Sequence, residues 1–228
     1  MTYMAQGVEI VHDNKSWDIM TFNEKMLFIA QQDMETKANI RKRLRSIRKK
    51  LTIEQVCDYS SKICEKLIKD RSICQNDYLF VYSAKQNEVD LTEFIHYALD
   101  NAMKVAFPRV DGADMDFYEV TSLKQLETGA FLIMEPKAEC KIIIPSQNET
   151  IGMLVPGVGF SLEGYRIGYG KGFYDRYLGK YPWIHTIGVA YEKQLCEEFL
   201  SDEFDVPMDK VITEEREVVI NEKFGNVM

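Results

Sequence analysis

The chain has 228 residues, of which 46% are hydrophobic, so it is long enough to bury a substantial core. We expect one domain, and no apolar run approaches the length of a membrane span. The N-terminal segment is no secretory signal either, because Glu9, Asp13 and Asp18 interrupt it and no apolar stretch follows a basic one. The composition therefore predicts a cytoplasmic protein.

The cysteines and histidines show no spacing typical of a metal site or of a disulfide framework. The five cysteines are odd in number and form no CxxC pair, and the three histidines are scattered. We interpret the cysteines as reduced thiols, which suits a reducing compartment.

Charge is distributed unevenly along the chain. The net charge of −8 disfavours general nucleic-acid binding, because such proteins need positive surface to displace counterions from phosphates. Residues 37–50 nevertheless contain eight lysines and arginines and no acid. This basic segment needs a specific explanation.

Residues 1–33 are mixed in character and show no clear periodicity. We expect them to form an extension outside the core fold that contributes nothing to catalysis, and residues 34–228 to form the domain. Two interpretations of the extension stay open, a loosely packed tail and a short helix at 26–30 that docks on the core. Met34 would be a natural start for the polypeptide.

Two helices are predicted next. An amphipathic helix is indicated over 37–51, where apolar residues recur at spacings of four, three and four, at Ile40, Leu44, Ile47 and Leu51. Thr52 is typical of a helix N-cap because Gln55 follows three residues later, and the second helix is predicted to end near Lys69.

Short apolar runs then alternate with helical segments. The expected strands are 78–82, 104–107, 115–120, 142–144, 152–155 and 186–191, and the expected helices are 91–101, 170–178 and 193–200. Pro108 is expected to close the second of these strands. This alternation predicts an α/β fold, as a single three-layer α/β/α domain with a mostly parallel central sheet.

The most informative stretch is 154–178, where a strand leads through glycines into a predicted helix. Gly168, Gly170 and Gly172 stand at alternate positions, with Lys171 between the last two. Such glycines let backbone N–H groups surround an anion without Cβ clashes, while the lysine and the helix N-terminus supply positive potential. The stretch therefore predicts a phosphate site.

This loop matches neither of the commonest phosphate motifs. Gly172 stands where Ser or Thr follows the lysine of a P-loop, and the even spacing of the glycines differs from GxGxxG. A flexible turn is the alternative interpretation. Arg166 and Asp175 in the same window favour a functional loop, since a carboxylate beside bound phosphates is a usual way to hold magnesium.

Two blocks in this stretch resemble the signature of the 5-formyltetrahydrofolate cyclo-ligase family. They are Val-Pro-Gly-Val-Gly-Phe at 155–160 and Arg-Ile-Gly-Tyr-Gly-Lys-Gly-Phe-Tyr-Asp-Arg at 166–176. The resemblance extends, in the family's order, to the blocks at 37–41, 86–89, 107–109 and 205–209, and covers roughly residues 35–215.

The resemblance implies ATP-dependent cyclisation of 5-formyltetrahydrofolate to 5,10-methenyltetrahydrofolate, with release of ADP and phosphate. The formyl oxygen would attack the γ-phosphate of ATP bound with Mg²⁺, N10 would add to the activated carbon, and phosphate would leave. The protein would mainly position the reactants and neutralise charge. The implied partner is a small-molecule substrate, with no nucleic acid and no membrane, and we expect a monomer or a weak dimer.

The resemblance also implies a role for each matching residue. The nucleotide would be bound by Lys37, Arg41, Arg166, Ile167, Gly168, Tyr169, Gly170, Lys171, Gly172, Phe173 and Tyr174, with Lys171 and Arg166 as the catalytic residues. The folate would contact Ser83, Glu88, Met115 and Tyr174, and Glu88 would hold its pterin-like ring. Asp175 and Asp205 would bind Mg²⁺.

Three other functions compete with this one. A nucleic-acid-binding protein could use the basic segment 37–50, but this function leaves Asp175 and Glu88 unexplained. A hydrolase built on Ser161 would need GxSxG spacing, which 159–164 lacks. A ligase-like relative with the same nucleotide site and another substrate stays open, because a fold alone does not determine a substrate.

Overall fold

The computed structural model describes residues 4–5, 8–9, 21, 36–197, 199 and 201–221. The chain divides into two compact units, residues 1–36 and residues 37–228. Within the first unit, β1 (Met4–Ala5) and β2 (Val8–Glu9) pair as antiparallel strands. The segment 26–30, one alternative for a docked helix, lies outside the described residues, and the assignment of 1–33 as an extension stays a prediction.

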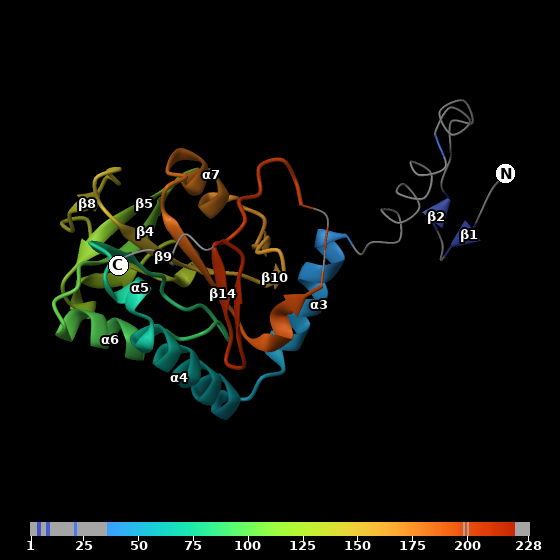
Figure 1. Cartoon of the computed structure of the whole chain (residues 1–228), viewed down its shortest axis with the longest axis horizontal. Coiled ribbons are helices and arrows are strands. Elements are labelled where there is room, and N and C mark those ends of the chain that lie inside the picture. The colour runs from blue at the N-terminus through green and yellow to red at the C-terminus, as the bar shows by residue number, and fades with distance from the viewer. Residues whose placement is uncertain are drawn as a thin grey trace. The chain divides into compact units, whose positions relative to one another are not determined.

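An eight-stranded sheet forms the centre of the second unit (Figure 1). Its strands are β3 (Tyr78–Phe80), β4 (Val105–Asp111), β5 (Asp114–Val120), β8 (Ile142–Ile143), β9 (Ile151–Pro156), β12 (His185–Val189), β14 (Lys210–Ile212) and β15 (Glu217–Val219). They lie in the order β15-β14-β12-β9-β3-β4-β5-β8. The five strands from β14 to β4 run parallel and the outer pairings are antiparallel, so the prediction of a mostly parallel central sheet is confirmed.

Helices cover both faces of this sheet. One face carries α4 (Ile53–Lys69), α5 (Arg71–Cys74) and α6 (Thr92–Asp100), and the other carries α7 (Phe173–Lys180) (Figure 1). Because side chains alternate along a strand, Leu79 packs in the apolar cluster of α4 and α6, whereas its neighbour Phe80 packs in the cluster of α7. The predicted three-layer architecture is confirmed.

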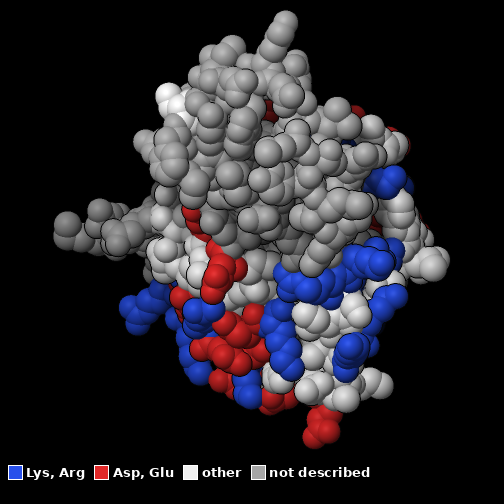
Figure 2. Space-filling model, turned by 90° about the vertical axis from the view of Figure 1, so that its right-hand side faces the viewer, with Lys and Arg blue, Asp and Glu red and all other residues white. Residues whose placement is uncertain are grey.

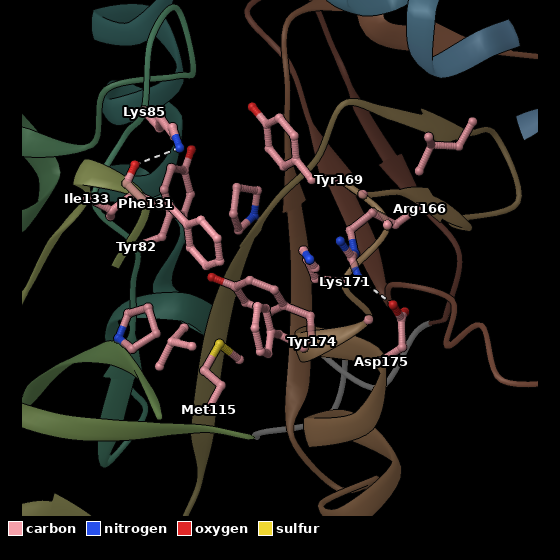
Figure 3. Close-up of a pocket in the computed structure, with 18 of the residues that line it drawn as sticks. Tyr82, Lys85, Met115, Phe131, Ile133, Arg166, Tyr169, Lys171, Tyr174 and Asp175 are labelled. Carbon is pink, nitrogen blue, oxygen red and sulfur yellow. Dashed lines mark hydrogen bonds and ion pairs between the residues drawn. The ribbon is translucent and has the colours of Figure 1, made fainter. Parts of the chain in front are cut away.

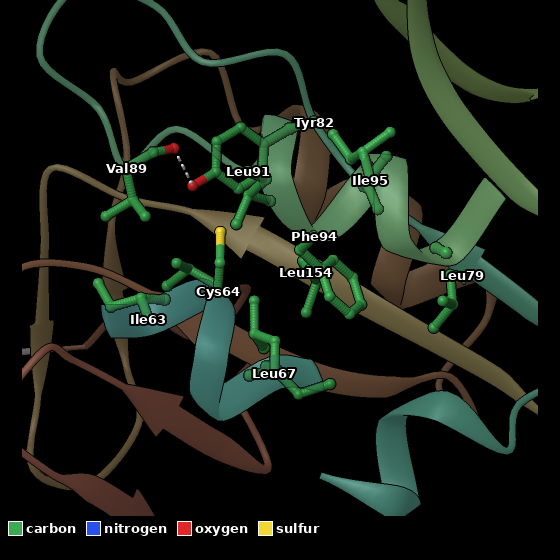
Figure 4. Close-up of a cluster of buried hydrophobic side chains, with 14 of the residues drawn as sticks. Ile63, Cys64, Leu67, Leu79, Tyr82, Val89, Leu91, Phe94, Ile95 and Leu154 are labelled. Carbon is green, nitrogen blue, oxygen red and sulfur yellow. Dashed lines mark hydrogen bonds between the residues drawn. The ribbon is translucent and has the colours of Figure 1, made fainter. Parts of the chain in front are cut away.

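The apolar cluster between α4, α6 and the sheet is deeply buried. Figure 4 shows Ile63, Cys64 and Leu67 of α4 close to Phe94 of α6 and Leu154 of β9. Each of these residues is at most 1% exposed. Burial raises the pKa of the Cys64 thiol to about 11, so this thiol is protonated at neutral pH. Within the described ranges, no helix is long and apolar enough to cross a membrane.

The start of α4 follows the sequence prediction. The Thr52 hydroxyl accepts a hydrogen bond of 3.1 Å from the backbone N–H of Gln55, and the Gln55 side chain accepts one of 3.0 Å from the Thr52 N–H. This reciprocal capping box satisfies two backbone donors that the helix itself leaves unpaired. The helix ends at Lys69, as predicted.

The basic segment forms α3 (Lys37–Lys49), which packs on a small sheet of β11 (Arg166–Ile167), β10 (Gly159–Ser161) and β13 (Leu195–Cys196). A Cβ atom at Gly159 would overlap the side chain of Leu44, so the glycine allows the helix to approach closely. The exposed basic residues of this segment are Lys42, Arg43, Arg45, Lys49 and Lys50. Figure 2 shows lysine and arginine side chains gathered on the side of the molecule where α3 lies.

The prediction of a helix over 193–200 is wrong for the residues that the structure describes in this range. Glu192–Gln194 forms a 3₁₀ turn, η3, and β13 follows it directly. The Gln194 side chain donates hydrogen bonds of 3.1 and 2.8 Å to the carbonyls of Gly157 and Val158. These tertiary bonds tie the segment to the small sheet and outweigh its local helical tendency.

Pro108 does not close its strand, contrary to the prediction. β4 continues to Asp111, and Pro108 pairs with Phe117 of β5. β3 pairs only with Val105 and Ala106, so beyond them β4 has a strand on one side only. At such an edge the missing N–H of proline breaks no ladder hydrogen bond.

The chain between β5 and β8 forms elements that the sequence analysis did not predict. They are η1 (Leu123–Gln125), β6 (Leu126–Thr128), η2 (Ala130–Leu132) and β7 (Met134–Pro136). β6 and β7 pair as an antiparallel hairpin, with η2 in its loop.

Candidate active site

The winding of the parallel strands reverses between β3 and β9. In chain order the parallel strands are β3, β4, β9, β12 and β14, so their order across the sheet is 2-1-3-4-5. Open α/β sheets bind ligands beyond the carboxyl ends of the strands at such a switch point. A cavity of about 450 Å³ lies here, lined by Tyr82 and Ser83 after β3 and by Pro156 at the end of β9.

Every residue that the sequence analysis assigns to a site lines this cavity. The residues come from α3, the loop after β3, β5, the stretch from β11 to α7, and the segment that precedes β14. The structure therefore brings the predicted nucleotide, folate and metal residues together, while their roles stay predictions.

A glycine loop, residues 168–172, connects β11 to α7 along one wall of the cavity. Gly170 and Gly172 have φ values of 91° and 66°, in the left-handed region that strains other residues. Gly172 is also the N-cap of α7. The loop thus places the positive end of a helix dipole at the cavity wall, where an anion would be stabilised.

Arginine side chains reinforce this wall. Arg41 Nε donates a hydrogen bond of 2.7 Å to the Gly168 carbonyl, and Arg166 Nη2 donates one of 2.7 Å to Asp175 (Figure 3). Arg166 Nε is buried and has no hydrogen-bond partner among the residues that the structure describes. Since a buried donor without a partner costs free energy, this atom fits a ligand that brings acceptor oxygens, such as a phosphate.

The two predicted metal ligands, Asp175 and Asp205, are both paired with cations. Asp175 is bound by Arg166, and Asp205 by Lys37, which also contacts Asp202 at 2.6 Å. Burial lowers the pKa of Lys37, but its hydrogen bonds to Asp202 and Asp205 outweigh burial and raise the pKa above its usual value. Lys37 is therefore charged at neutral pH.

A metal ion would find few protein ligands here. In the part of the chain that the structure describes, no group of three or more His, Cys, Asp or Glu side chains could hold one. Carboxylate oxygens are suitable ligands for Mg²⁺, but most of its coordination would have to come from phosphate and water oxygens.

The opposite wall is aromatic and apolar. It contains Tyr82, Pro108, Val110, Met115, Phe131 and Ile133, and it is joined by the ring of Tyr174 from α7, whose centroid lies 5.3 Å from Arg166 Cζ. Figure 3 shows Tyr82, Phe131 and Ile133 across the cavity from Lys171 and Arg166. Burial raises the pKa of the Tyr174 hydroxyl far above its usual range, so the hydroxyl is a neutral hydrogen-bonding group.

Two polar residues predicted for the folate lie on this side of the cavity. The Glu88 side chain is 7% exposed, and its Oε2 accepts a hydrogen bond of 2.9 Å from the backbone N–H of Lys85. Ser83 lines the cavity, but its hydroxyl donates to the Met134 carbonyl at 2.7 Å and so joins the loop to β7. Lys85 Nζ donates to the Phe131 carbonyl at 2.7 Å and fixes η2 in the same way.

Residues 33–214 match the model of the 5-formyltetrahydrofolate cyclo-ligase family. The chain belongs to this family. It is 27% identical over 197 residues to the 5-formyltetrahydrofolate cyclo-ligase of Mus musculus, a match that covers 78% of this chain and 92% of the relative.

Two solved structures have the same fold. One is a 5,10-methenyltetrahydrofolate synthetase from Aquifex aeolicus, with 32% identity, a TM-score of 0.72 and coverage of 84% of this chain and 95% of that one. The other is a 5,10-methenyltetrahydrofolate synthetase from Mycoplasma pneumoniae, with 26% identity, a TM-score of 0.65 and coverage of 79% and 99%. The predicted family, fold and enzyme class of this cyclo-ligase family member are confirmed.

Several cavity residues of this family member were missed by sequence reasoning. Tyr82 ends the predicted strand 78–82 and Lys85 lies three residues after it, and the switch-point rule would have found both once the strand order was known. Phe131 belongs to the β6–β7 hairpin, whose sequence carries no periodic signal. Arg48 does not line the cavity but contacts its residues Glu88 and Tyr169, and its position seven residues after Arg41 on the same face of α3 could have indicated it.

The structure gives no support to a nucleophilic Ser161. This residue is 1% exposed, and its Oγ accepts a hydrogen bond of 3.1 Å from the Tyr165 N–H within the small sheet. A buried hydroxyl of this kind cannot reach a substrate in the cavity.

Proposed function

We propose that this family member catalyses the ATP-dependent cyclisation of 5-formyltetrahydrofolate to 5,10-methenyltetrahydrofolate, with release of ADP and phosphate. The observation that carries the proposal is the two-sided cavity, with a cationic glycine loop on one wall and an aromatic wall with a buried carboxylate on the other. The first wall suits a polyphosphate, and the second suits a flat heterocycle with N–H donors. The relative from Mus musculus is named 5-formyltetrahydrofolate cyclo-ligase, and the one from Aquifex aeolicus is named 5,10-methenyltetrahydrofolate synthetase.

The glycine loop and its cations would hold the nucleotide. When bound, ATP supplies a phosphoryl group to the formyl oxygen, which then leaves as phosphate as N10 closes the ring. Lys171 and Arg166, which line the cavity beside the N-terminus of α7, would neutralise negative charge on the transferred group. Arg41 would hold the loop through the Gly168 carbonyl.

The aromatic wall would bind the folate. Met115 and Tyr174 would pack on its ring system, and the Glu88 carboxylate would accept hydrogen bonds from ring N–H groups. Ser83 lies on the same wall. Holding the formyl oxygen close to the nucleotide would make the transfer effectively intramolecular.

We also propose that Asp175 and Asp205 would hold Mg²⁺, which would supply positive charge beside the phosphates. Their carboxylate oxygens are of the type that Mg²⁺ binds. The ion pairs that Asp175 and Asp205 form with Arg166 and Lys37 would open when the metal arrives with the phosphates.

A cytoplasmic location is part of the same proposal. Cys57 is exposed and carries a free thiol, which suits a reducing compartment. The expectation of a monomer or weak dimer stays a prediction.

The test is an assay of the purified protein with 5-formyltetrahydrofolate, ATP and Mg²⁺. We expect the absorbance of the methenyl product to rise together with ADP, and omission of ATP or Mg²⁺ to abolish both. Methenyl product at full rate without nucleotide would refute the proposal. ATP consumption without this product would favour a ligase-like relative that acts on another substrate.

A further inference from the structure

Arg48 is a buried cation that no role assigned so far explains. It lies in the last turn of α3, and its side chain is 4% exposed. A buried guanidinium is stable only when it is fully paired, because its desolvation is costly. Its Nη1 donates a hydrogen bond of 3.2 Å to the Gly157 carbonyl and lies 3.6 Å from Glu88 Oε1, and its Nη2 donates to the Tyr169 hydroxyl.

Tyr169 continues this chain of hydrogen bonds to the cavity. Its hydroxyl accepts from Arg48 and donates to Glu88 Oε1 at 2.8 Å. Burial, followed by the negative charge of Glu88, raises the pKa of Tyr169, so the hydroxyl keeps the proton that it donates. The hydrogen bonds therefore all point in one direction, from the Arg48 guanidinium through the Tyr169 hydroxyl to the Glu88 carboxylate.

The loop that carries Glu88 is anchored to α3 as well. The Asn87 side chain donates hydrogen bonds of 3.2 Å to the carbonyls of Arg48 and Leu51. The Glu88 carbonyl accepts a hydrogen bond of 3.1 Å from the Tyr191 hydroxyl. The backbone of Glu88 is thus fixed independently of its carboxylate, and the direction of the carboxylate depends on Arg48, Tyr169 and the Lys85 N–H.

We infer that Arg48 is a positioning residue for the aromatic wall that would bind the folate. The hydroxyl of Tyr169 orients the Glu88 carboxylate, although Tyr169 belongs to the glycine loop. This inference rests on the proposed function. The chain of hydrogen bonds orients the Glu88 carboxylate and balances its charge, so that the carboxylate is ready to accept hydrogen bonds from the folate ring. Because Tyr169 stands within the loop assigned to phosphate binding, the two substrate sites share one structural element.

The variants Arg48→Met and Tyr169→Phe remove the cation and the hydroxyl, and each retains most of the side-chain volume. Arg45→Met is the matched control, because Arg45 lies on the same helix with its guanidinium 5.6 Å from the centroid of the Tyr169 ring and is exposed. Steady-state kinetics at saturating MgATP give the KM for 5-formyltetrahydrofolate and kcat, and calorimetric titration with ADP gives nucleotide affinity.

We expect Arg48→Met and Tyr169→Phe to raise the folate KM by roughly 10- to 100-fold, the effect of losing a hydrogen bond to a charged group. The affinity for ADP should change by less than about twofold, because the Tyr169 hydroxyl is engaged with Glu88. In a Glu88→Gln background, Arg48→Met should add little further effect. A merely structural role of Arg48 would instead give additive losses.

Three results would overturn the inference. The first is a Tyr169→Phe protein that binds ADP more weakly with an unchanged folate KM, and the second is an Arg45→Met protein that matches Arg48→Met. The third is full additivity of Arg48→Met with Glu88→Gln. If Arg48→Met does not fold, the folate KM and ADP affinity of Tyr169→Phe test the inference alone, because this variant removes only one hydroxyl and is expected to fold. Failure of the proposed function appears differently, as a wild-type chain without cyclisation activity.

Discussion

Replacing Gly170 by alanine would test whether the left-handed glycine loop holds the nucleotide. A Cβ atom at Gly170 would meet nothing closer than the Arg41 guanidinium, at 3.9 Å. Space is therefore available, and only the φ of 91° opposes the substitution. A left-handed residue other than glycine costs about 1–2 kcal/mol. The loop would either carry this strain or relax and turn its N–H groups away from the phosphates.

Gly112 offers a matched control in the turn between β4 and β5. It has a φ of 59°, and its Cβ would meet no atom of the described residues within 4 Å. We expect both alanine variants to lose about 1 kcal/mol of unfolding free energy, which lowers the Tm of a protein of this size by about 2–4 °C. Only Gly170→Ala should raise the KM for ATP, by up to roughly 5-fold, because about 1 kcal/mol of the strain of about 1–2 kcal/mol already lowers the stability of the free protein and only the remainder opposes nucleotide binding.

The assay combines thermal unfolding of both variants with steady-state kinetics in which ATP and folate are varied separately. Equal KM values for ATP in the two variants would show that the conformation of the loop does not determine nucleotide binding. A larger effect of Gly170→Ala on the folate KM than on the ATP KM would also refute the reasoning.

Three further predictions address other parts of the chain. We expect Lys171→Ala to lower kcat far more than it weakens folate binding, and Glu88→Ala to weaken mainly folate binding, by about 1.5–3 kcal/mol; equal effects of both variants on kcat and on the folate KM would contradict this division. Burial raises the pKa of Asp70, but hydrogen bonds from Lys210 and Ser72 outweigh burial and hold the pKa below the usual 3.8. This stabilisation is complete above the unfolded-state pKa and is lost as the pH falls through the lower folded-state value, so Asp70→Asn should flatten the loss of stability below about pH 4 in denaturant titrations, and an unchanged pH profile would count against it. A chain that begins at Met34 should keep the kcat/KM and Tm of the full chain, and a Tm drop of more than roughly 4 °C would mean that residues 1–33 contribute about 1 kcal/mol or more to stability.

The glycine loop was predictable because its information is local. Left-handed conformation at Gly170 and Gly172, the N-terminus of α7 and the charge of Lys171 are all encoded within a few consecutive residues. The helix 37–49 was predictable for a similar reason, since its apolar spacing is contiguous. Patterns of this kind need no knowledge of distant partners.

The contacts of the site residues were not predictable, because they depend on which segments the fold brings together. The spacing of Lys37 and Arg41 placed both on one helix face, but no pattern showed that Lys37 pairs with Asp205 or that Arg41 binds the Gly168 carbonyl. The same holds for the helix predicted over 193–200. The helix propensity of this segment is outweighed by the hydrogen bonds that the Gln194 side chain makes with another segment.

The pairing of Lys37 with Asp205 joins positions that are 168 residues apart in the chain. Synthesis proceeds from the N-terminus, so Lys37 leaves the ribosome long before its partner, and closing so long a loop is entropically costly. Of the parallel strands β14 is made last, and it completes their run in the sheet. A chain that is terminated before β14 would therefore lack a closed cavity, even if the stop codon lies late in the gene. Enzymatic activity would accordingly require translation to pass β14.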